Sequence, residues 1–194
     1  MKTPDYLTEQ ELEDLLKKAL DGRYGVRDAL LISLAYHHCM RVSEVIELKL
    51  SDIEDGRIRV NRKKGSVSNE QPLQSAVGEP WLDEKKLLNR YLVWRKTHRN
   101  AASDRLFVGQ KGHLTRQQVY NIVHNAAVAA GIPTTKCRTH ILKHSGISHL
   151  VQRGMPLLHV RDYAGHKDFR STLFYAGVSS DQVNAAASAA FARS

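Results

Sequence analysis

Apolar residues recur along most of the chain at the three-to-four-residue spacing of helices that bury one face. Two capping-box sequences begin such stretches. Thr8 to Glu11 predicts a helix that runs to about residue 20, and Thr115 to Gln118 predicts another that Gly131 ends. The same periodicity predicts further helices at residues 26–38, 41–48, 82–98, 140–153, 156–164 and 181–192.

Between these helical segments, one stretch alternates polar and apolar residues. Residues 57–65 read Arg-Ile-Arg-Val-Asn-Arg-Lys-Lys-Gly, a strand followed by a turn, and a returning strand reaches Pro72 and Leu73. Another short strand is predicted at 106–108. The predicted fold class is therefore mainly α with a small antiparallel β-sheet (α+β).

The length and composition indicate one folded domain. The chain has 194 residues, of which 42% are hydrophobic and 25% charged, as in globular proteins. Its two cysteines, Cys39 and Cys137, form no CxxC pair, which excludes a disulfide framework and a cysteine-built zinc site. No apolar run is long enough to span a membrane. These features predict a cytoplasmic protein without a membrane partner.

The charge is unevenly distributed. The formal net charge is +9, but residues 1–56 carry −5, whereas residues 57–110 and 111–175 carry +7 each. Seven of the ten histidines also fall in 111–175. This pattern favours a polyanionic partner, with nucleic acid first, because phosphate neutralisation releases counterions. The alternative is a basic protein with no such partner.

Potentially reactive residues gather in the second half of the chain. His140, Lys143 and His144 would share one face of a helix by the i, i+3, i+4 rule, and His166 precedes Tyr175 by nine residues. The spacing of His140 and His144 also suits two zinc ligands, but no HExxH glutamate lies between them. A metal site is therefore not predicted.

Two basic features lie in the first half. Arg41 and Glu44 are one helical turn apart, so the carboxylate can hold the guanidinium. Lys63 and Lys64 precede Gly65 at the predicted hairpin turn. Taken alone, the first would be a surface ion pair and the second a solvated turn.

Together, these segments resemble the catalytic domain of tyrosine site-specific recombinases, the phage integrase family. Residues 40–48 with Asp52 and Ile53 are similar to its first arginine box, and Lys64-Gly65 followed by Pro72-Leu73 resembles its hairpin lysine. Residues 140–145 resemble its second box, and residues 165–175 its third. The match covers roughly residues 7–178. The hairpin also resembles that of the short fimbrial phase-switching recombinases.

The resemblance implies that double-stranded DNA is cut and rejoined through a 3′-phosphotyrosyl link, without metal, ATP or another cofactor. The implied catalytic residues are Tyr175 as nucleophile, Lys64 as general acid, and Arg41, His140, Lys143 and His166 around the phosphate. Glu44 would orient Arg41, and His144 would act as a base for Tyr175 or support it. Basic residues near these boxes are expected to contact DNA: Arg62, Lys63, Arg116, Lys136, Arg138 and Lys167.

The chain departs from the family pattern at Lys143, where the family has arginine. Lysine keeps the charge but loses the two-pronged grip, so slower cleavage or a shifted phosphate is expected. Three explanations stay open: a tolerated variant, an inactive descendant and an introduced change. A smaller departure is Ala164, where the family usually has leucine.

The boxes begin close to the start of the chain, without the N-terminal DNA-clamping domain that is common in the family. Residues 1–194 are therefore expected to form a single catalytic domain, either a fragment or a short recombinase. It would act as a tetramer on paired sites, with accessory DNA-bending proteins, in the nucleoid. The tail from about residue 181 to 194 would dock on a neighbouring subunit or fold back. The rival functions are a non-catalytic DNA-binding regulator and a type IB topoisomerase-like relaxing enzyme.

Overall fold

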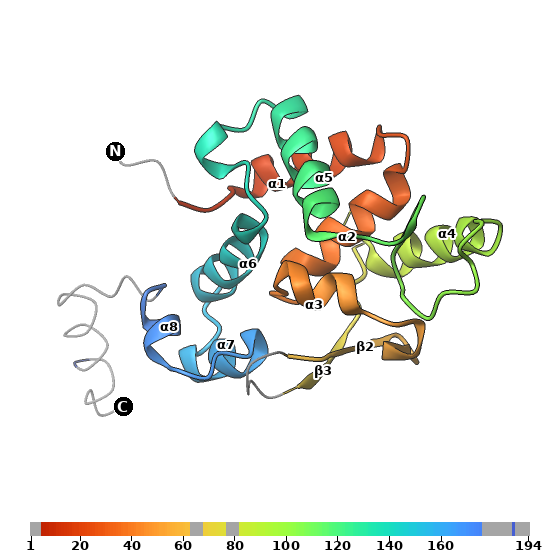
Figure 1. Ribbon diagram of the computed structural model, residues 1–194. Helices are drawn as coiled ribbons and strands as arrows, with labels where there is room; N and C mark the ends of the chain where they lie inside the picture. Colours follow the sequence, from red (N-terminus) through yellow and green to blue (C-terminus); the bar gives the residue numbers. More distant parts are fainter. Residues whose placement is uncertain (1–4, 63–67, 77–81, 176–187, 189–194) are drawn as a thin grey trace.

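The computed structural model describes residues 5–62, 68–76, 82–175 and 188. Eight α-helices occur in these ranges: α1 (Glu9–Leu20), α2 (Gly25–His37), α3 (Val42–Glu47), α4 (Glu84–Lys96), α5 (Arg116–Ala129), α6 (His140–Gln152), α7 (Leu157–Ala164) and α8 (Arg170–Leu173) (Figure 1). Two 3₁₀ turns, η1 (Leu50–Asp52) and η2 (Thr134–Lys136), accompany them. The predicted final helix lies outside the described residues, except for Ser188.

The strands form two small antiparallel sheets. One has the order β1 (Ile53–Glu54), β2 (Arg57–Val60) and β3 (Asn69–Pro72), and the other pairs β4 (Val108–Gly109) with β5 (Gly112–His113). The mainly α fold class with a small antiparallel sheet is confirmed. The strand predicted at 106–108 was wrong for its first two residues. The Leu106 amide donates to the Leu48 carbonyl instead, and both Leu106 and Phe107 are buried in the core.

Local sequence signals set the ends of several helices. Thr8 and Thr115 each accept a hydrogen bond from the backbone amide three residues on, and Glu11 and Gln118 reach back, so both predicted capping boxes are present. Gly131, with a φ of 70°, follows the end of α5 as predicted.

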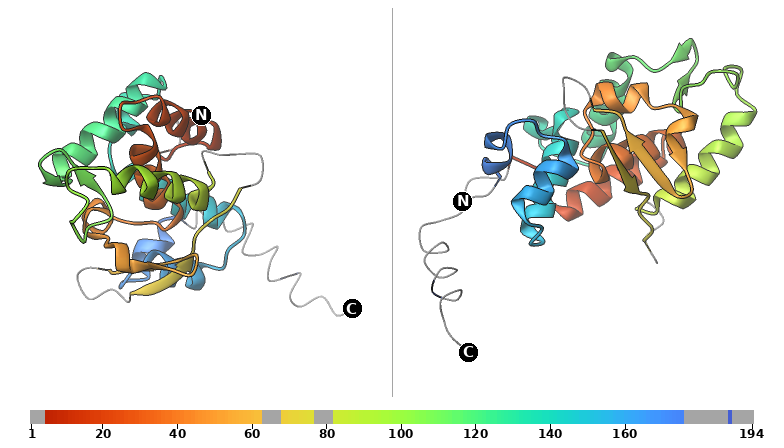
Figure 2. Two further views of the ribbon diagram at one scale, coloured as in Figure 1. Left: turned by 90° about the vertical axis from the view of Figure 1, so that its right-hand side faces the viewer. Right: turned by 90° about the horizontal axis from the view of Figure 1, so that it is seen from below.

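A large apolar core joins α1, α2, α4 and α5. The helix α2 lies at its centre and contacts α1, α4 and α6. A separate small cluster consists of Cys39, Ile147, Val160 and Ala164, where the chain after α2 meets α6 and α7. In Figure 1, α7, α8 and the strands β2 and β3 lie along one side, and the left-hand view of Figure 2 also shows them next to one another. Within the described part of the chain, none of the helices is long and apolar enough to cross a membrane.

Candidate active site

A cavity of about 410 Å³ brings together residues from four separate segments. Its lining comprises Arg41, His140, Lys143, His144, His166, Ser171, Phe174 and Tyr175. Arg41 is the residue before α3, His140 begins α6, and His166 follows α7. The structure therefore places five predicted catalytic residues and His144 around one cavity. The sixth, Lys64, lies outside the described residues, as does Lys63.

Tyr175 is hydrogen-bonded to His144 at the edge of this cavity. The Tyr175 hydroxyl lies 2.8 Å from His144 Nδ1, and the Tyr175 ring stacks with His166 at 6.5 Å between centroids. Burial raises the pKa of Tyr175 to about 12, so the phenol keeps its proton at neutral pH. The pKa of His144 is lowered mainly by burial and to a smaller extent by the His140 charge. The His144 imidazole is therefore neutral and can accept the phenolic proton of Tyr175. The pair has the geometry of a nucleophile with its base.

Glu44 lies between two guanidinium groups. Its fully buried carboxylate accepts from Arg41 Nη1 at 3.0 Å, from the Arg41 amide at 2.8 Å and from Arg62 Nη1 at 3.1 Å. Burial alone would raise the pKa of Glu44, but the Arg41 amide and the Arg62 charge outweigh it, so the pKa lies below its ordinary value. Arg41 keeps 37% of its side chain exposed. An ionised Glu44 thus holds an Arg41 that is still able to bind an anion.

Lys143 is buried, and its Nζ donates to the Ala164 carbonyl at 2.8 Å. Burial, together with the Arg62 and Arg41 charges, lowers the pKa of Lys143 to about 7. The lysine therefore loses its charge much closer to neutral pH than an ordinary lysine does. An arginine at this position would stay charged, so the replacement changes the electrostatics of the cavity as well as its shape.

His166 is fixed by Thr172, which the sequence pattern did not indicate. His166 Nδ1 lies 2.9 Å from the hydroxyl of the fully buried Thr172. Burial and the Lys143 and Arg41 charges lower the pKa of His166 to about 4, so the ring is neutral. Gly165, with a φ of 63°, ends α7 and directs the chain toward His166.

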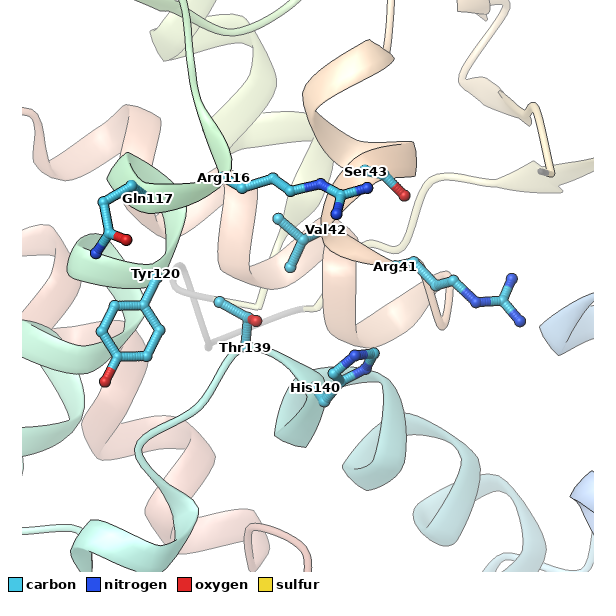
Figure 3. A pocket seen from close by; sticks show the side chains of 8 residues that line it. All are labelled: Arg41, Val42, Ser43, Arg116, Gln117, Tyr120, Thr139 and His140. Carbon is cyan, nitrogen blue, oxygen red and sulfur yellow. The ribbon is translucent and has the colours of Figure 1, made fainter. Parts of the chain in front are cut away.

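A second hollow of about 520 Å³ adjoins the first and shares Arg41 and His140 with it. Its other lining residues are Val42, Ser43, Arg116, Gln117, Tyr120 and Thr139. Figure 3 shows Arg116 reaching from α5 toward Ser43 at the start of α3, with Gln117 and Tyr120 on the same helix. Arg116, Gln117 and Tyr120 are exposed, so this groove offers cationic, amide and aromatic groups to a ligand. Gln117, Tyr120 and Thr139 were not predicted.

The structure corrects the prediction that Lys136 and Arg62 contact DNA. The Lys136 Nζ is buried and paired with the Glu11 carboxylate at 2.7 and 2.9 Å, and the Arg62 guanidinium is fully buried beside Glu44. Neither is available to a phosphate at the surface. Arg138 and Lys167 are exposed, as expected of DNA contacts, and Arg138 lies 3.2 Å from Asp5.

Residues 5–182 match the phage integrase family model. The Type 1 fimbriae regulatory protein FimE of Escherichia coli (strain K12) is 34% identical over 174 residues, which cover 88% of this chain and 84% of FimE. Tyrosine recombinase XerD of Oceanobacillus iheyensis is 32% identical over 91% of this chain and 59% of XerD. The structure of XerH site-specific recombinase bound to difH substrate aligns with a TM-score of 0.78 and 27% identity. That alignment covers 97% of this chain and about half of XerH (55%).

Proposed function

Because the chain belongs to the phage integrase family of tyrosine recombinases, we propose that it cuts and rejoins duplex DNA at specific sites with Tyr175 as the nucleophile. The observation that carries this proposal is the bond between the Tyr175 hydroxyl and His144, at the edge of a cavity that Arg41 and Lys143 also line. Phosphodiester cleavage requires a nucleophile, charge stabilisation on the non-bridging oxygens and a proton for the leaving oxygen. The described residues supply the first two.

In the proposed step, the Tyr175 oxygen attacks the scissile phosphorus while His144 takes the phenolic proton. The bond between phosphorus and the 5′ oxygen breaks, and that oxygen receives a proton from Lys64, a role that rests on the family resemblance. The product is a 3′-phosphotyrosyl link and a free 5′ hydroxyl. Rejoining is the reverse reaction, so no external energy source enters the balance.

The phosphate would sit against Arg41, whose orientation the buried Glu44 carboxylate fixes. His140, His166 and the charged form of Lys143 would stabilise the additional negative charge of the transition state. His166 is neutral at physiological pH, because its pKa is lowered to about 4, so it contributes a hydrogen bond rather than a net charge. Arg41 is therefore the principal fixed cation of the described site.

The groove beside the cavity supports a path for the duplex. Arg116 in this groove would bind a backbone phosphate, as would the exposed Arg138 and Lys167 outside it, and Gln117 and Tyr120 on α5 would contact base edges. We also propose assembly as a tetramer on paired sites, accessory DNA-bending proteins as helpers, and a cytoplasmic, nucleoid-associated location. These proposals rest on the family and on the DNA substrate.

A trapping experiment tests the proposed nucleophile. Duplexes built from DNA flanking the gene are nicked beside the scissile phosphate, so that the released fragment diffuses away and cleavage cannot reverse. We expect a covalent protein–DNA band that resists SDS, and we expect Tyr175→Phe to abolish it while DNA binding persists. An adduct formed by Tyr175→Phe would show that another residue is the nucleophile. Binding without any adduct from the wild type would favour the regulator.

Tyr163→Phe is the matched control. Tyr163 is also close to the site, but its hydroxyl donates to the His37 carbonyl at 3.0 Å and burial raises its pKa strongly. The variant should therefore keep the adduct at the level of the wild type, after correction for the folded fraction.

A further inference from the structure

Arg62 has no assigned role in the reaction, yet it occupies the centre of the polar contacts behind the cavity. Its Nη1 donates to the Cys39 carbonyl at 3.0 Å and to the Glu44 carboxylate at 3.1 Å. Its Nη2 donates to the His38 carbonyl at 2.9 Å and to the Tyr163 carbonyl at 2.7 Å. One side chain thus joins the chain between the end of α2 and the start of α3 to the end of α7, which is 101 residues away from Arg62 in the sequence.

Each of these segments leads directly to a residue of the proposed site. The carbonyls that Arg62 binds after α2 lie just before Arg41, and Glu44 holds the Arg41 guanidinium. Tyr163 lies three residues before His166. Arg62 itself precedes Lys64 by two residues. Movement of Arg62 would therefore shift the groups that surround the phosphate relative to one another.

Gly165 provides an independent sign of this arrangement. A Cβ at Gly165 would lie 2.8 Å from both Cδ and Nε of Arg62, closer than such contacts occur. Gly131 ends α5 with a similar φ of 70°, yet a Cβ there would meet nothing within 4 Å. At Gly165, then, the missing side chain serves two needs, the left-handed backbone and the space that Arg62 fills.

Stability alone does not account for this arginine. Within the described part of the chain, Arg62 Nε is buried without an acceptor, and an unsatisfied buried donor costs free energy. Buried ion pairs are also often no more stabilising than apolar residues of similar volume. Arg95, a buried arginine outside the cavity lining, differs in that all three of its side-chain nitrogens have acceptors. Its Nε, Nη1 and Nη2 donate to four backbone carbonyls.

We propose that Arg62 is a positioning residue for DNA cleavage, which fixes Arg41 through Glu44 and His166 through the end of α7. The proposal rests on the recombinase function proposed above. Arg62 does not touch the phosphate, so its loss should lower the rate of the chemical step and leave DNA affinity nearly unchanged. A displacement of about 1 Å in a reacting geometry can cost about 100-fold in rate.

The experiment compares Arg62→Lys with Arg95→Lys, two equivalent changes of buried arginines. Single-turnover cleavage of the nicked duplex at saturating protein, the dissociation constant for the same DNA and the folded fraction are measured for each. We expect Arg62→Lys to cleave roughly 10- to 100-fold more slowly than Arg95→Lys per folded molecule, with dissociation constants within about threefold. Equal cleavage rates, or a loss confined to DNA affinity, would overturn the assignment.

A second pair of variants tests the role of Arg62 without replacing the arginine itself. Gly165→Ala and Gly131→Ala introduce the same left-handed strain, but only the first presses on Arg62. We expect Gly165→Ala to slow cleavage and Gly131→Ala to leave the rate unchanged. Equal rates per folded molecule would count against the proposal.

Adduct formation by the wild-type protein separates a failure of the recombinase function from a failure of the role proposed for Arg62. If it forms no adduct, the recombinase function and the role of Arg62 fail together. If it does and both pairs match, only the role of Arg62 fails.

Discussion

The large core and the region behind the cavity are held together in different ways. In the core, α1, α2, α4 and α5 meet through apolar side chains that are almost wholly buried. Behind the cavity, the small cluster has four buried apolar residues in the described part of the chain, with partly buried apolar residues packed against them, and polar contacts are added to this packing. The apolar core specifies the fold, whereas the site depends on hydrogen bonds that have strict geometry.

The end of α7 shows how these polar contacts work. The last carbonyls of a helix have no partner within the helix, and they carry a partial negative charge. Arg62 and the Gln71 amide bind the Tyr163 carbonyl, and Lys143 binds the Ala164 carbonyl. Side chains from the segment after β2, from β3 and from α6 therefore fix the point from which the chain continues to His166. Changes in the two regions should have different consequences.

The largest expected effect is on the stability of the core. Leu16 on α1 is fully buried, so Leu16→Ala should lower the free energy of unfolding by about 3 kcal/mol through lost burial and a residual cavity. The cleavage rate per folded molecule should not change, because α1 supplies no residue to the cavity lining. Urea unfolding and single-turnover cleavage measure the two quantities. A rate that falls with stability would show that the core and the site are not separable.

The next prediction concerns Glu84, which joins α4 to the end of α2. Burial would raise the pKa of this carboxyl, but the charges and hydrogen bonds of His38 and His37 lower it to about 2. Since the pKa is lowered on folding, the stabilisation is complete above the unfolded value near 4.5 and is lost as the pH falls toward 2. The loss should amount to about 3 kcal/mol.

Glu84→Gln tests this directly. The variant lacks the titrating carboxylate, so the difference in unfolding free energy between wild type and variant should shrink steadily from pH 5 downward. Acid titration of urea unfolding measures it. A difference that stays constant over this range would show that the Glu84 pKa is not lowered by folding.

Much of the fold could be predicted because its signals are local. The capping boxes at Thr8 and Thr115 occupy four residues each, and helical periodicity needs only a few turns. The hydrogen-bond partners of Arg62 and Lys136 could not be predicted in this way. Arg62 and the Tyr163 carbonyl are 101 residues apart, and Lys136 and Glu11 are 125 apart. A basic residue in a basic segment looks like a surface contact until its partner is known.

The same limit applied within the site. The residue types and their spacing identified most of the groups that line the cavity, because these follow the motif. Thr172, which fixes His166, belongs to no spacing rule, and a threonine six residues later is common. Supporting contacts of this kind depend on where α7 and α8 meet, which only the folded chain defines.

A pair of buried valines compares the two regions directly. Val123 on α5 belongs to the large core and Val160 on α7 to the small cluster, and both are fully buried. Each valine-to-alanine change should lower the free energy of unfolding by about 2 kcal/mol or less, since two methyl groups are lost. Only Val160→Ala should also slow cleavage, because α7 positions His166. Equal cleavage rates per folded molecule would show that polar contacts alone hold α7.

The smallest expected effect is at Lys143, and it depends on pH. Because its pKa is lowered to about 7, the lysine loses its charge as the pH rises through that value, whereas an arginine stays charged. Lys143→Arg should therefore cleave roughly twofold faster than wild type at pH 7, and up to about tenfold faster at pH 8. The phosphate of bound DNA favours the charged lysine, so these ratios are upper values. Lys136→Arg, at a buried lysine paired with Glu11, is the control and should give a ratio independent of pH. A constant ratio for Lys143→Arg, or one below unity, would mean that the cavity is built for lysine and that its charge does not limit cleavage.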